Sequence, residues 1–127
     1  MTTLPPLTQE TLWGILRQEV SDAVVNQLLA ESLGYRFDPE SQTWDCGAVE
    51  ESWRAEYPEP PDFLGNRPPM VKLTRSIPAP YKQLLKEKLG FGGYKIGEFT
   101  PNHTRRATAV SWFLYRLEIA ANPERLS

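Results

Sequence analysis

The sequence contains very little sulfur or imidazole: among 127 residues, Cys46 is the one cysteine and His103 the one histidine. A single cysteine excludes an internal disulfide and a multi-cysteine zinc site. The histidine has no second histidine, nearby cysteine or suitably spaced carboxylates, which makes it a poor candidate for a metal ligand. We therefore interpret Cys46 as a buried, inert thiol and expect neither a metal nor a cofactor.

Long apolar runs are also missing. The first ten residues lack the basic region and apolar core of a signal peptide. The longest apolar run, near residue 115, is interrupted by Arg116 and Glu118, so no membrane span is predicted. We expect a cytoplasmic protein.

The sequence also lacks the common catalytic motifs. The glycine-rich segment 90–97 fits neither G-x-G-x-x-G nor the phosphate-loop pattern, and it is better interpreted as a turn. No G-x-S-x-G occurs, and pairs of acids such as Glu50 and Glu51 are typical of an exposed face. Because no nucleophile and base can be nominated, the sequence favours a non-enzymatic protein. An enzyme of unknown type ranks third, after an interaction protein and a nucleic-acid-binding protein, both described below.

The N-terminal half has no lysine. Residues 1–63 contain three arginines and 12 acids, a net charge of −9, whereas residues 64–127 contain 11 bases and 4 acids, a net charge of +7. Such asymmetry has two interpretations that the sequence leaves open. Either the two halves pack together and neutralise each other, or the basic half binds an acidic partner.

Apolar side chains that recur every three or four residues, together with capping residues, predict five helices, at about 9–20, 22–33, 48–56, 81–89 and 101–121. The turn residues Asp38 and Pro39 lie between short aromatic segments and predict a β-hairpin at 35–44. Segment 58–69 holds five prolines and is interpreted as an ordered loop without helix; 70–74 is predicted as a short strand. The predicted fold class is therefore α+β and mainly helical, with about five helices and a small β-hairpin.

The length and the 40% content of hydrophobic residues suit one domain with a substantial core. We expect a single domain spanning residues 1–127. It would consist of an acidic helical half at 1–57, the Pro-rich ordered loop at 58–69 and a basic half at 70–127.

The last predicted helix is expected to be the central element of the fold. Thr100 suits an N-cap and Pro101 the first helical position. One face carries apolar residues at steps of three and four, and a second apolar face carries Trp112, Tyr115 and Ile119. A helix that is apolar on two sides is either packed between other elements or offers one side to a partner, so these three residues form a candidate partner face.

The start of this helix is also the best candidate for binding an anion or an acidic partner. His103, Arg105 and Arg106 lie in its first two turns, and Lys72 and Lys95 are candidates to lie nearby. Free backbone N–H groups favour a negative ligand there, and arginine offers a planar fork for carboxylate or phosphate. The acid that meets these arginines comes either from the N-terminal half or from a partner.

A nucleic-acid-binding protein is the alternative hypothesis. Helix 81–89, a glycine-containing turn and the last helix follow the order of a helix-turn-helix, with Arg105 and Arg106 where base-reading residues would lie. However, the ten-residue connection exceeds the usual three or four residues. The overall pI near 5.5 also disfavours a protein that follows a phosphate backbone.

Several segments are distinctive in order and composition: GYRFDPESQTWD, YPEPPDF, VKLTRSI, KQLLKEKLGFGGYKIGE and TRRATA. Together, over roughly residues 12–117, they resemble a small family of cyanobacteria and plant plastids that is catalogued as a domain of unknown function. The resemblance implies a cyanobacterial cytoplasm or plastid stroma as the setting, with an accessory role near photosynthetic or plastid machinery, and no catalytic residues. The leading hypothesis is a non-enzymatic interaction protein whose basic half binds another macromolecule, most readily a protein.

Overall fold

The computed structural model describes residues 4–93 and 100–121. The fold is mainly helical with one two-stranded antiparallel hairpin, which confirms the predicted α+β class. In chain order the elements are α1 (Gln9–Leu16), α2 (Asp22–Leu33), β1 (Arg36–Asp38), β2 (Thr43–Asp45), α3 (Glu51–Arg54), α4 (Arg67–Ser76), the 3-10 helix η1 (Ala79–Tyr81), α5 (Leu84–Leu89) and α6 (Pro101–Ala121). None of these helices is both long and apolar enough to cross a membrane within the described ranges.

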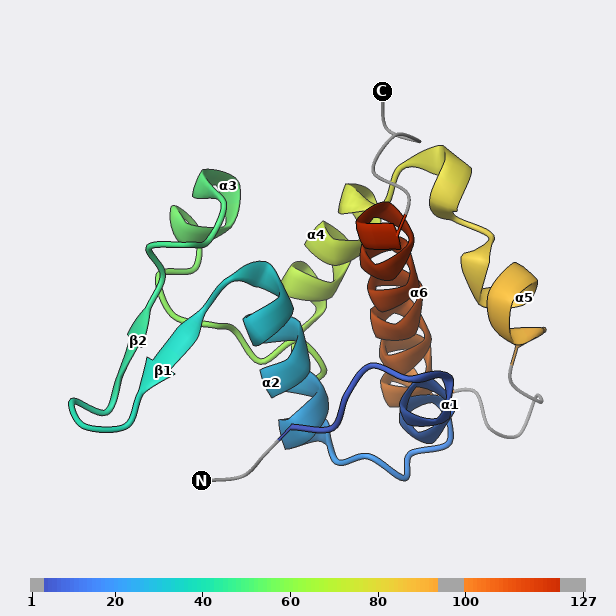
Figure 1. The fold of residues 1–127 in the computed structure, drawn as a ribbon, viewed down its shortest axis with the longest axis horizontal. Helices are drawn as coiled ribbons and strands as arrows, with labels where there is room; N and C mark the ends of the chain where they lie inside the picture. Colours follow the sequence, from blue (N-terminus) through green and yellow to red (C-terminus); the bar gives the residue numbers. More distant parts are fainter. Residues whose placement is uncertain (1–3, 94–99, 122–127) are drawn as a thin grey trace.

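The long helix α6 is the central element, as predicted. It contacts α1, α4, α5 and α2 (Figure 1). Its start is capped by Thr100, whose Oγ1 accepts a hydrogen bond of 3.1 Å from the backbone N–H of His103. Along its middle, Trp112 and Phe113 are almost fully buried, so α6 supplies the large side chains around which the other helices pack.

One hydrophobic cluster joins the acidic and the basic halves of the chain. Leu12 and Ile15 of α1, Leu29 of α2, Leu73 of α4 and Phe113 of α6 are each at most 2% exposed and belong to the same cluster. The two halves therefore share a core rather than building one each.

Helix α2 has the bounds that the sequence predicts, because both of its ends are capped. Ser21 Oγ accepts a hydrogen bond of 3.3 Å from the N–H of Val24. Gly34 follows the last turn in a left-handed conformation, with φ of 111°. A Cβ at Gly34 would lie 2.6 Å from the backbone oxygen of Ala48, so this position has no room for a side chain.

The hairpin pairs Phe37 with Trp44 across its two strands. Its turn is held by Asp38, whose Oδ1 accepts from the N–H of Glu40 at 3.0 Å and whose Oδ2 accepts from Ser41 Oγ at 2.9 Å. Figure 1 shows the hairpin extending away from α6, on the opposite side of α2. The predicted hairpin at 35–44 is confirmed, with the strands shifted by about one residue.

The predicted strand at 70–74 and the helix-free loop up to residue 69 are wrong, because α4 covers Arg67–Ser76. Pro68 and Pro69 occupy the first turn of α4, where backbone N–H groups have no partners within the helix, so proline costs little there. Only the part of the Pro-rich segment before Arg67 is a loop.

Three other predicted helices are shorter than expected. Helix α1 ends at Leu16 rather than near residue 20, since Gln18 has a φ of 62° and turns the chain. Helix α3 covers four residues, and the helix predicted at 81–89 is divided into η1 and α5. Cys46 is half-buried rather than fully buried.

Candidate functional site

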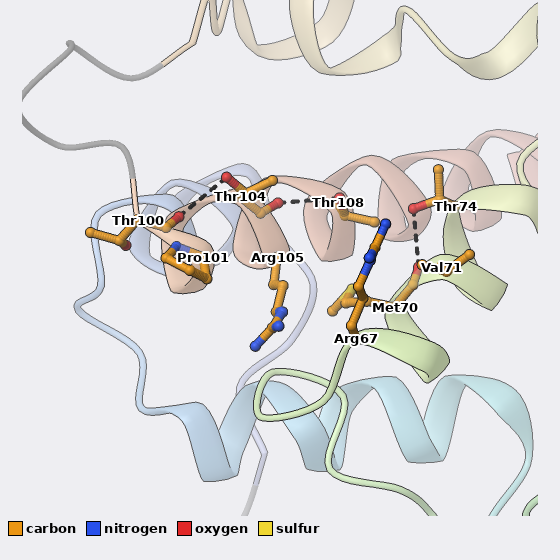
Figure 2. A pocket seen from close by; sticks show the side chains of 9 residues that line it. All are labelled: Arg67, Met70, Val71, Thr74, Thr100, Pro101, Thr104, Arg105 and Thr108. Atoms are coloured by element: carbon orange, nitrogen blue, oxygen red, sulfur yellow. Dashed lines mark hydrogen bonds between the residues drawn. The ribbon is translucent and has the colours of Figure 1, made fainter.

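A groove runs between α4 and α6. Its volume is about 440 Å³, and its walls combine two arginines and four threonines with apolar side chains (Figure 2). The lining residues are Arg67, Met70, Val71, Thr74, Thr100, Pro101, Thr104, Arg105 and Thr108. None of these residues is acidic, so the part of the groove wall that the described residues form is positively charged.

A second hollow of about 320 Å³ continues the groove toward α5. It shares Thr74, Thr104 and Thr108 with the first hollow and adds Lys82, together with apolar residues of α5 and α6. We call the two hollows together the α6 groove. Among the described residues, three cations line its length, Arg67, Lys82 and Arg105, and no carboxylate does.

The two arginines enter the groove from opposite helices. Arg67 begins α4 and reaches toward Thr108 on α6 (Figure 2). It makes no hydrogen bond or ion pair within the described part of the chain, and it is exposed. Arg105 is half-buried, and its Nη1 donates a hydrogen bond of 2.9 Å to the backbone oxygen of Leu64. Arg67 is therefore available to a ligand, whereas Arg105 is already oriented by one contact.

The threonine hydroxyls are engaged with their own helices. Thr74, Thr104 and Thr108 each donate to the backbone oxygen four residues earlier, at 3.0, 3.2 and 3.2 Å. Their methyl groups and the neighbouring apolar side chains make the walls partly apolar. The groove thus suits a negatively charged group that is flanked by apolar atoms.

Arg106 lies inside the fold, although the sequence made it a candidate for binding a partner. It is 3% exposed. Its Nη2 donates to Asp22 Oδ1 at 2.5 Å, its Nη1 to the backbone oxygen of Ile15 at 2.9 Å and its Nε to Asn102 Oδ1 at 2.8 Å. The acid that meets Arg106 comes from the N-terminal half, so this arginine is not available to a partner.

The remaining predicted cations lie in different places. Lys72 Nζ contacts Glu56 Oε1 at 2.8 Å and the backbone oxygen of Ser52 at 2.9 Å, outside the α6 groove. His103 Nδ1 lies 2.7 Å from Thr100 Oγ1, so the histidine takes part in the helix cap. Lys95 lies outside the described residues. Of the five predicted residues, Arg105 lines the groove.

The proposed apolar partner face of α6 is mostly covered. Trp112 is 1% exposed and is part of the core, which corrects its assignment to a partner surface. Tyr115 and Ile119 are half-buried and pack against the core; the ring centroid of Tyr115 lies 5.2 Å from that of Tyr81. The second apolar side of α6 therefore serves mainly to hold α6 within the fold.

Two of the three cationic residues that line the described part of the α6 groove are not among the sequence-predicted site residues. Arg67 lies in the segment 58–69, which the sequence predicts as a loop, whereas the structure places it at the start of α4. Lys82 lies outside the apolar stripe of the helix that the sequence predicts at 81–89, and this pattern indicates exposure without showing which neighbour the lysine faces.

Asp22 provides a test of the internal ion pair. The hydrogen bond from Arg106 holds the pKa of Asp22 below its usual value. Because the folded-state pKa is lowered, the stabilisation is complete above the unfolded pKa of about 3.9 and is lost as the pH falls through the folded pKa. We expect Asp22→Asn to lower the free energy of unfolding at pH 7 by about 1 kcal/mol, since solvent screens a side chain that is 57% exposed. Urea unfolding from pH 7 to pH 2 should show this difference shrinking below about pH 4; a difference that is constant with pH would contradict it.

Comparisons with known proteins confirm the part of the resemblance that concerns a domain of unknown function. A solved structure determined by solution NMR is 51% identical, covers 96% of this chain and 100% of its own, and superimposes with a TM-score of 0.82. No curated protein matches the sequence. Residues 6–118 match the family described as "Domain of unknown function (DUF1823)". The chain therefore belongs to the DUF1823 family.

Proposed function

We propose that this protein is a non-enzymatic interaction or accessory protein that binds an acidic segment of another protein in the α6 groove. The observation that carries the proposal is the lining of the groove, where the described residues include three cations and no carboxylate. Arg106 and Lys72, by contrast, are each matched by an acid of the chain itself. Cations that the fold leaves unmatched are the ones that an external acid would bind.

The chemistry of the groove favours a carboxylate-bearing peptide. Guanidinium groups bind carboxylates through two parallel hydrogen bonds, and Arg67 and Arg105 approach from opposite walls (Figure 2). The partly apolar walls would accept aliphatic side chains next to the acidic ones. An extended segment with alternating acidic and apolar residues satisfies both parts of the groove.

Nucleic acid fits the groove less well. Affinity for nucleic acid depends on many phosphate contacts, whereas three cations line the groove, and residues 1–63 carry a net charge of −9. Of the two arginines that a helix-turn-helix would use to read bases, Arg106 is buried against Asp22. These facts support a protein partner over a nucleic acid.

The resemblance of segments such as GYRFDPESQTWD to proteins of cyanobacteria and plastids supports a biological setting for this role. We propose that the protein acts in a cyanobacterial cytoplasm or a plastid stroma, as an accessory factor near photosynthetic or plastid machinery.

Charge reversal in the groove tests the proposal. A labelled peptide of alternating glutamate and leucine is expected to bind, and the double variant Arg67→Glu, Lys82→Glu should bind it about tenfold more weakly at low salt, because each exposed charge contact contributes about 0.5–1 kcal/mol. The measurement is fluorescence anisotropy at 20 mM and 200 mM salt, since exposed charge contacts weaken with ionic strength.

The matched control is Arg75→Glu, Lys86→Glu. It makes the same charge change with exposed residues of α4 and α5 that do not line the groove. An equal loss in both double variants would show that net charge rather than the groove attracts the peptide. Tight binding of single-stranded RNA or duplex DNA, lost in the groove variant alone, would instead favour the nucleic-acid alternative.

A further inference from the structure

The hairpin exposes an aromatic pair. Phe37 is 45% exposed and, with Leu117, is one of two large hydrophobic residues that the described part of the chain leaves exposed. Its ring centroid lies 5.1 Å from that of Trp44, which stands directly opposite on β2. Figure 1 shows the hairpin on the opposite side of α2 from α6, so the pair is separate from the α6 groove.

The turn of the hairpin has its own set of hydrogen bonds. Asp38 binds Glu40 and Ser41, and Gln42 Nε2 donates to the backbone oxygen of Pro39 at 2.7 Å. These contacts fix the turn and therefore the register of the strands. The aromatic pair adds a cross-strand contact, but it leaves Phe37 exposed.

Trp44 also lines a hollow beside the hairpin. The hollow, of about 240 Å³, lies between α2 and the Pro-rich segment, and its other walls include Asn26, Pro60, Pro61 and Asp62. Asp62 Oδ1 accepts hydrogen bonds from Asn26 Nδ2 at 2.7 Å and from the N–H of residue 65 at 2.9 Å, whereas Oδ2 has no hydrogen-bond partner in the described residues. An indole ring and a carboxylate with a free oxygen are the two groups that bind a guanidinium or an ammonium group.

The charge around the hairpin is strongly negative. Residues 31–62 contain nine acids, two arginines and no lysine, and all nine acids are exposed. Arg36 is occupied by the backbone oxygens of Glu31 and Tyr35, each at 2.8 Å. A ligand that covers the aromatic pair therefore meets a field that attracts cations and repels phosphate groups.

We propose that the hairpin and the hollow form a second docking surface, for a basic segment of a partner protein. An arginine or lysine of that segment would enter the hollow between Trp44 and Asp62, and a neighbouring apolar side chain would cover Phe37. The negative charge excludes an anionic membrane or a nucleic acid as the occupant. The hairpin and the hollow belong to the N-terminal half, and binding there is independent of the proposed role of the α6 groove.

Nuclear magnetic resonance of the full chain labelled with ¹⁵N tests this surface with a peptide of alternating arginine and leucine. The indole N–H signal of Trp44, identified with Trp44→Phe, should shift in a saturable way together with the amides of the hairpin. Phe37→Ser and Asp62→Asn should each weaken the peptide by about fivefold. Unchanged core signals in both variants would show that the fold is retained.

Glu19→Gln is the matched control, since it removes one exposed acid near the end of α1, which lies away from the hairpin (Figure 1). It should change the affinity by less than about twofold. Equal weakening by Glu19→Gln and Asp62→Asn would overturn the proposal, because the attraction would then be a property of net charge. An unmoved Trp44 indole signal, or an equal shift of that signal by a peptide of alternating glutamate and leucine, would also overturn it.

Discussion

Replacing Arg106 with methionine is expected to lower the free energy of unfolding by about 2–3 kcal/mol. The side chain is 3% exposed and donates to three oxygens that belong to α1, α6 and the start of α2. Methionine fills the volume of the stem but donates none of these bonds. The loss stays below that of a fully buried ion pair, because Asp22 is 57% exposed and becomes hydrated.

Urea denaturation at pH 7 measures this loss of stability. Two further variants show whether the loss comes from the hydrogen-bond network. Arg116→Met removes an exposed arginine from the same helix, whose guanidinium lies 5.3 Å from the ring centroid of Trp112, and should cost about 0.5 kcal/mol. In a double-mutant cycle, Asp22→Asn should have little further effect once Arg106 is methionine. A stability of Arg106→Met equal to that of Arg116→Met would show that the network does not hold the helices together.

Gly34→Ala is expected to be comparably severe, with a loss of about 2–4 kcal/mol. The added Cβ would lie 2.6 Å from the oxygen and 2.9 Å from the carbonyl carbon of Ala48. These are backbone atoms of the segment that leads into α3, so no side-chain rotation relieves the contact. Residue 34 also has a φ of 111°, which an L-amino acid rarely adopts.

Gly90→Ala separates the two causes, and the measurement is again urea denaturation. Gly90 ends α5 with a φ of 68°, and a Cβ there would meet no atom within 4 Å. Its replacement should therefore cost only the left-handed conformation, about 1 kcal/mol. If both glycine variants lose the same stability, the contact with Ala48 is not what constrains residue 34.

Elements with local signals at both ends were predictable from the sequence. Helix α2 has the predicted bounds because Ser21 and Gly34 determine its ends through contacts within a few residues. The start of α6 at Pro101 follows from Thr100 in the same way. Such signals depend on the chain within one helical turn, so they need no knowledge of tertiary packing.

Helix α4 shows where local reasoning fails. Proline is compatible with a loop and with the first turn of a helix, so Pro68 and Pro69 do not distinguish the two. What favours the helix is the burial of Met70 and Leu73, one turn apart, against the rest of the core. That contact is tertiary, so it cannot be inferred from the weak alternation of residues 70–74, which by itself predicts a strand.

The positive charge of the candidate site was predictable from the sequence, but which arginine faces the groove was not. Arg105 and Arg106 are adjacent, and successive residues of an α-helix point about 100° apart. One turns toward the groove beside α4, whereas the other turns toward α1 and Asp22. The sequence places both in a basic half, but only the packing around α6 decides which of them is matched within the chain.

The contact between α1 and α6 joins segments that are far apart in the sequence. Leu12 and Ile15 are synthesised well before the helix that packs on α1, which begins at Pro101. We expect their apolar surface to stay exposed on the nascent chain until α6 has been made. Because this contact has a large sequence separation, we expect it to form more slowly than the local helices.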